Sequence, residues 1–118
     1  MSEYVFRLGE FNGSDMLEFQ HKKQPVSEKK FWNPDSLYVE DAAFYFFLED
    51  IFKEVVPDFD MFEHTVVEKS QWKEIMQLEH SKWAGNIDAQ TITDTMNEIN
   101  EWVKRFIPDD EAFFVLGV

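Results

Sequence analysis

Carboxylates are the most abundant groups in this sequence that could do chemistry, and they gather in short clusters. Asp58 and Asp60 have the spacing of the first two ligands of a calcium-binding loop. Such a loop needs glycine at its sixth position and a bidentate glutamate at its twelfth, where this sequence has Glu63 and Lys69. The Asp-Asp-Glu run at 109–111 could bind a divalent cation weakly, but its composition favours a solvated turn. We therefore expect no metal site.

Catalytic motifs built on histidine, glycine or cysteine do not occur in the sequence. His80 cannot belong to a His-Glu-x-x-His zinc motif, because Ser81 follows it and Met76 stands four residues before it. The four glycines form neither a phosphate-binding loop nor a nucleophile elbow. The absence of cysteine excludes a thiol nucleophile, a zinc ribbon and a disulfide scaffold. We expect a protein that is not an enzyme and that uses no cofactor.

Binding has more support, because acidic residues recur beside aromatic ones in segments expected to be loops. Aromatic side chains anchor protein interfaces, and complementary charge speeds association. Core aromatics beside solvated acids would give the same pattern, so both interpretations stay open for each cluster. The candidate partner-binding residues are Trp32, Asp35, Tyr38, Asp58, Phe59, Asp60, Glu63, Asp109, Asp110 and Glu111.

The negative charge is concentrated in the second part of the chain. The 118 residues include 24 Asp and Glu against 11 Lys and Arg, a net charge of −13. Residues 1–34 hold five acids and five bases, so the whole excess follows residue 34. This excess disfavours binding to nucleic acids or anionic membranes and favours a basic protein partner.

Neither a targeting signal nor a membrane span is indicated. The first eight residues lack the basic and apolar regions of a signal peptide. The longest apolar runs, 42–48 and 112–118, are far shorter than the roughly 20 residues that cross a bilayer. We expect a cytoplasmic protein.

Periodicity and turn residues predict strands and helices that would position these clusters. Alternating apolar residues predict an N-terminal hairpin of strands at 4–8 and 17–21 around a turn at 11–14, followed by an exposed loop over 22–33. Helices are predicted from 40 to 55, from 70 to 83 and from 88 or 91 to 106. The first has apolar residues on all sides, which predicts a central, buried helix. Residues 61–68 fit a strand or a loop, and 112–118 a buried strand.

These elements predict one α+β domain over residues 1–118, with a mainly antiparallel sheet and two or three helices packed on one face. The 20 aromatic residues supply enough bulk for a compact core.

A short, acidic, cysteine-free α+β chain with aromatic-rich strands at both ends resembles bacterial immunity proteins. The stretch from Pro57 to Ile75 and the closing Phe-Phe-Val-Leu-Gly-Val run at 113–118 carry the resemblance. It implies a cytoplasmic antitoxin of a polymorphic-toxin or contact-dependent growth inhibition system. Such a protein binds a cognate toxin domain, often a nuclease, and covers or deforms its active site. The alternatives are an acidic nucleic-acid mimic and another small protein-binding module.

Overall fold

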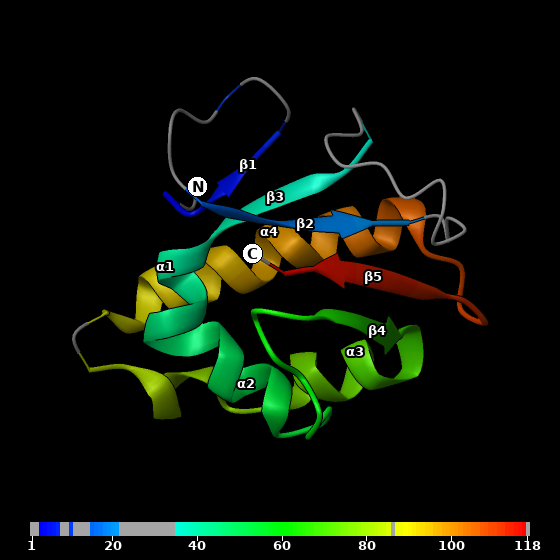
Figure 1. Ribbon diagram of the computed structural model, residues 1–118. Helices are drawn as coiled ribbons and strands as arrows, with labels where there is room; N and C mark the ends of the chain where they lie inside the picture. Colours follow the sequence, from blue (N-terminus) through cyan, green and yellow to red (C-terminus); the bar gives the residue numbers. More distant parts are fainter. Residues whose placement is uncertain (1–2, 8–9, 11–14, 22–34, 86, 118) are drawn as a thin grey trace.

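A five-stranded antiparallel sheet forms the centre of the molecule (Figure 1). The computed structural model describes residues 3–7, 10, 15–21, 35–85 and 87–117. The strand order is β1-β3-β2-β5-β4, and each neighbouring pair is antiparallel. The strands are β1 Val5–Phe6, β2 Met16–Gln20, β3 Leu37–Glu40, β4 His64–Glu68 and β5 Ala112–Leu116.

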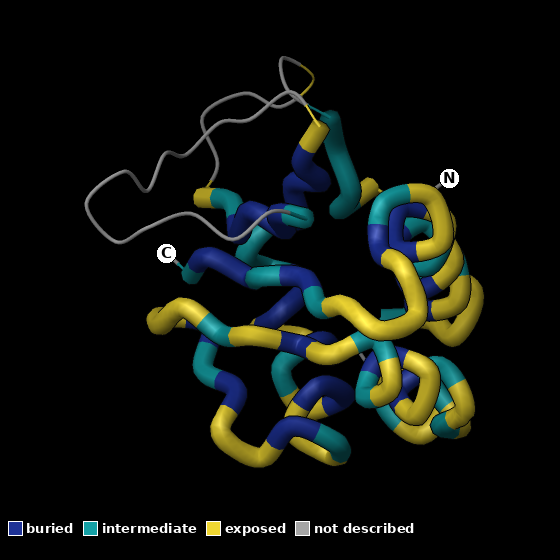
Figure 2. The backbone as a smooth tube through the Cα atoms, turned by 90° about the vertical axis from the view of Figure 1, so that its right-hand side faces the viewer, coloured by how far each residue is buried: buried dark blue, intermediate teal, exposed yellow. Residues whose placement is uncertain are grey.

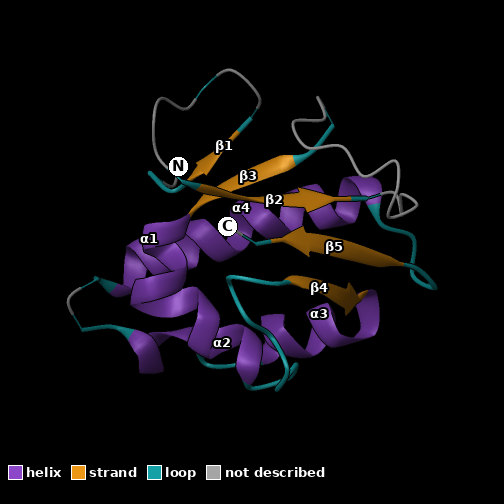
Figure 3. Cartoon of the chain, in the orientation of Figure 1, coloured by secondary structure: helices purple, strands orange, loops and turns teal. Residues whose placement is uncertain are grey.

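Within the described residues, three helical segments accompany the sheet (Figure 3). The first is continuous and includes a π-helical turn in its middle. Its parts are α1 Asp41–Ala43, the π turn η2 Phe44–Leu48 and α2 Glu49–Lys53. The other two are α3 Lys69–Gln77 and α4 Ala89–Phe106, and the short 3-10 turn η3 His80–Trp83 lies between them in the chain. Asp88 caps α4 by accepting the Thr91 N–H at 2.8 Å, which satisfies one of the unpaired donors of its first turn.

The core lies between one face of the sheet and the helices. In Figure 2, α3 and α4 lie on the same side of the strands. The aromatic ring of Phe19 in β2 stacks on Phe113 of β5 at 5.6 Å, and Trp102 of α4 meets Phe113 edge-on at 5.8 Å. The indole N–H of Trp72 in α3 donates to Asn100 Oδ1 of α4 at 2.9 Å, so a buried polar group is satisfied. The predicted α+β architecture is confirmed.

The predicted N-terminal hairpin is wrong, because β1 and β2 do not pair with each other. Both pair with β3, which lies between them: Phe6 and Glu18 are the two cross-strand neighbours of Tyr38. Residues 37–40 immediately precede the first helix, and the sequence pattern did not separate this short strand from the helix start. The predicted turn at 11–14 and the loop over 22–33 lie outside the described residues.

The other elements follow the predicted order with changed ends. A strand forms within 61–68, and the helices near 40–55 and 88–106 are present. The helix predicted over 70–83 ends at Gln77, because Leu78 is extended (ψ 152°). The carbonyl oxygen of Ile75 accepts from Leu78 N at 3.2 Å and lies 2.8 Å from the His80 ring. These local partners replace the next helical hydrogen bond.

Candidate functional site

The loop between α2 and β4 holds one of the predicted acid clusters, formed by Asp58, Asp60 and Glu63. Asp58 and Glu63 are exposed, whereas Asp60 is half-buried and its Oδ1 accepts the Phe62 N–H at 2.9 Å. Phe59 is buried, with its ring 4.9 Å from that of Phe52. The assignment of Phe59 to partner binding is therefore wrong, since its side chain anchors the loop in the core and cannot contact a partner.

An exposed aromatic patch lies beside this loop, formed by Tyr45, Phe46 and Phe62. Their side chains are 64%, 51% and 56% exposed. The rings of Tyr45 and Phe62 meet edge-to-face with centroids 6.4 Å apart, an arrangement that aromatic pairs favour. Residues from the first helical segment and from the loop before β4 thus form one surface feature, which we call the aromatic patch.

The π-helical turn explains why two adjacent aromatics of this segment face outward. The N–H of Glu49 donates to the carbonyl of Phe44, five residues earlier, which widens the turn. Phe44, Phe47 and Leu48 are buried, and the two residues between them are exposed. The prediction of a helix buried on all sides is wrong here. Single π turns are rare in proteins, and those that occur often lie at functional sites.

Two further contacts hold the loop against its neighbours. Glu49 Oε2 accepts the Met61 N–H at 3.1 Å, which ties the loop to the helix, while its other carboxylate oxygen lies 3.5 Å from Lys53 Nζ. The backbone of Gly117, the residue after β5, lies close to the backbone of the loop. A Cβ at Gly117 would lie 2.6 Å from the Met61 carbonyl oxygen and 2.7 Å from the Glu63 nitrogen. Only glycine permits this close approach of backbone to backbone.

The aromatic patch lies within the most acidic part of the chain. Residues 41–68, which we call the acidic segment, hold eight Asp and Glu and one Lys, a net charge of −7. Among the residues that the structure describes, four large hydrophobic side chains are exposed: Tyr45, Phe46, Phe62 and Val66. All four belong to the acidic segment. The surplus of negative charge and the exposed apolar surface therefore coincide in one segment.

The second predicted cluster, 109–111, is compensated by lysines of α3. Asp109 Oδ1 lies 3.2 Å from Lys73 Nζ and 3.4 Å from Lys69 Nζ, and Lys69 also donates to the Ile107 carbonyl at 2.5 Å. Hydrogen bonds from Lys73 and Lys69 lower the pKa of Asp109. Phe113, the aromatic residue next to this cluster, is buried. The arrangement braces α3 against the start of β5.

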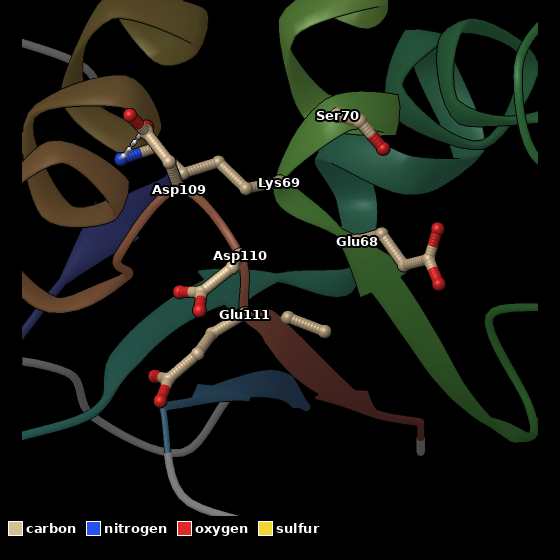
Figure 4. A pocket seen from close by; sticks show the side chains of 7 residues that line it. Glu68, Lys69, Ser70, Asp109, Asp110 and Glu111 are labelled. Carbon is tan, nitrogen blue, oxygen red and sulfur yellow. Dashed lines mark ion pairs between the residues drawn. The ribbon is translucent and has the colours of Figure 1, made fainter.

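A pocket of about 270 Å³ lies at this brace, between the starts of α3 and β5 (Figure 4). Figure 4 shows Lys69 directed to Asp109, while the carboxylates of Asp110 and Glu111 lie apart from that pair. Glu68 is the residue immediately before α3, and its backbone N–H donates to Gln71 Oε1 at 2.9 Å. Three of the residues that line the pocket, Glu68, Lys69 and Asp109, are therefore engaged in local contacts at the start of α3 and before β5.

The third predicted cluster is divided between core and surface. Asp35 is exposed, and its Oδ2 lies 3.6 Å from His21 Nε2. Tyr38 is fully buried in β3, where its hydroxyl donates to Glu18 Oε2 at 3.4 Å. Burial, and then the nearby Glu18 carboxylate, raise the pKa of Tyr38 far above its usual range. The assignment of Tyr38 to partner binding is wrong for the same reason as that of Phe59. Trp32 lies outside the described residues.

Within the described ranges, no group of three or more His, Asp or Glu residues is arranged to hold a metal ion. The helices in this part of the chain include none with the length and apolar character that crossing a membrane requires. Comparisons with protein-family models, with curated proteins and with solved structures found no match to this chain.

Proposed function

We propose that this chain is an immunity protein, a cytoplasmic antitoxin that binds a basic toxin domain and blocks it without catalysing a reaction. The observation that carries the proposal is the coincidence of the −7 charge of the acidic segment with the aromatic patch, whose members are the three exposed aromatic residues among the large hydrophobic side chains of the described residues. Protein interfaces combine aromatic anchors with a charged rim, and this segment supplies both.

Charge and apolar surface serve different steps of such an encounter. Opposed fields raise association rate constants to about 10⁸–10⁹ M⁻¹s⁻¹ at low salt, compared with roughly 10⁵–10⁶ without steering. An antitoxin benefits from this speed, because it must reach its toxin before the toxin reaches its target. Burial of aromatic surface then slows dissociation. A basic nuclease domain would meet the first requirement, since proteins that bind nucleic acid carry positive surfaces.

The proposal predicts that a gene next to that of this chain encodes a toxin with a basic domain, and this candidate toxin domain is the partner to test. Co-expression should protect cells from that domain, and the purified proteins should form a 1:1 complex whose association rate falls steeply as salt rises. An acidic nucleic-acid mimic would instead bind many unrelated DNA-binding proteins in competition with DNA. Absence of both binding and protection at every salt concentration would refute the proposal.

A matched pair of charge reversals locates the steering surface. Asp58→Lys with Glu63→Lys and Asp110→Lys with Glu111→Lys change the net charge equally, and all four side chains are exposed. The first pair should slow association by about tenfold or more, because the reversed charges lie near the aromatic patch. The second should slow it by about threefold or less. Equal effects would show that net charge alone steers the encounter.

A further inference from the structure

We infer that the aromatic patch is the anchoring centre of the interface, and that the partner presents an apolar recess bordered by Lys and Arg side chains. The inference rests on the proposed function and specifies the surface of the partner. Tyr45 and Phe62 already contact each other edge-to-face, so they present one continuous apolar projection of two rings. Phe46, the next residue of the π turn, is also exposed.

The patch is held in place before any partner arrives. Phe44 and Phe47 fix the π turn from the buried side, and Glu49 fixes the loop by accepting the Met61 N–H. The Asp60 carboxylate accepts the N–H of Phe62 itself at 2.9 Å. Side chains that are already ordered lose less entropy on binding, so a larger part of their contact energy contributes to affinity. Large aromatic residues in such positions are typical interface anchors.

Charge indicates which occupant fits this surface. A second copy of this chain would bring two segments of charge −7 together, and a nucleic acid or an anionic membrane would also be repelled. A basic protein would gain from the same field. Its Lys and Arg side chains could pair with the exposed Asp58 and Glu63 and stack on the faces of exposed aromatic rings. A basic, recessed protein surface is therefore the occupant that we propose.

The experiment compares two variants. The first carries both Tyr45→Ala and Phe62→Ala, and the second, Val66→Ala, is the matched control. Val66 is 53% exposed on β4 within the same acidic segment, but it is not part of the aromatic patch. Binding to the candidate toxin domain is measured kinetically. The double variant should raise Kd by about 30-fold or more, almost entirely through faster dissociation. Association should change by less than about twofold, because no charge is altered. Val66→Ala should change Kd by less than about threefold.

The outcomes separate this inference from the proposed function. If the unaltered chain does not bind the toxin domain, the proposed function fails. If it binds and the double variant binds equally well, the function stands and the aromatic patch is not the anchor. Sedimentation of the unaltered chain alone tests the remaining occupant. A dimer that the double variant converts to a monomer would assign the patch to a second copy and overturn the inference. Circular dichroism confirms that each variant is folded.

Discussion

Two acidic loops of this protein resemble each other in sequence and differ in what surrounds them. Each begins at a proline, Pro57 or Pro108, continues with aspartates and leads into a strand, β4 or β5. These strands are antiparallel neighbours, so the loops lie at opposite ends of the pair. The residues that end one strand therefore lie beside the loop that begins the other.

The two loops therefore have different surroundings, because each lies beside the residues that follow the other strand. After β4 the chain continues into α3, whose Lys69 and Lys73 reach Asp109 in the second loop. After β5 comes Gly117, which offers the first loop no charge and lets its backbone approach closely. The first loop keeps its negative charge toward solvent beside the aromatic patch, while the second becomes a structural brace. The same acidic composition thus leaves carboxylates exposed in one loop and pairs them with lysines in the other.

The largest expected effect is on the free energy of unfolding, and it distinguishes the buried from the exposed phenylalanine of the first loop. Phe59→Ala should lower the free energy of unfolding by about 3–5 kcal/mol, because it leaves a cavity between Phe44 and Phe52. Phe62→Ala, three residues later, should change it by less than about 0.5 kcal/mol, because that side chain is exposed. Urea denaturation of both variants measures the difference. Similar losses would contradict the division of this loop into a buried anchor, Phe59, and an exposed side chain, Phe62.

The second prediction concerns the support of the first loop by the end of β5. Gly117→Ala should destabilise the protein by about 1–3 kcal/mol, since the added methyl would overlap the backbone of Met61 and Glu63. The matched control is Gly85→Ala, where a Cβ would meet nothing within 4 Å. Thermal unfolding of the two variants provides the comparison. If both glycines tolerate alanine equally, the loop is not held by Gly117.

Elements with long or regular patterns were predictable from the sequence. Helix α4 has apolar residues spaced by three and four, a capping Asp88 and basic residues at its end, and all of these are local signals. Strand β3 was missed because four residues before a helix carry little periodicity, and its place between β1 and β2 depends on contacts distant in sequence.

The candidate site was predictable only in part, because loops have no periodicity from which burial can be read. The sequence indicates that acids and aromatics gather around 58–63, yet it does not show that Phe59 is buried in the core while Phe62 is exposed. Tyr45 and Phe46 were assigned to a buried helix, and the π turn that exposes them leaves no recognisable sequence signal. The sequence contains one indication of this exposure. The helix has apolar residues on every side, and those that do not face the core would need a binding partner to cover them.

The smallest expected effect is a pH dependence confined to the braced loop. The pKa of Asp109 is lowered in the folded state by hydrogen bonds from Lys73 and Lys69. Its contribution to stability is therefore complete above its unfolded pKa of about 3.9 and is lost as the pH falls through the lower folded value. The stability difference between the unaltered chain and Asp109→Asn should be constant from about pH 7 to pH 5 and should shrink toward pH 3. In a Lys73→Met background this pH-dependent part should be smaller, because the largest cause of the lowered pKa is gone. Urea denaturation at each pH measures both differences, and a difference that grows as the pH falls would contradict the brace.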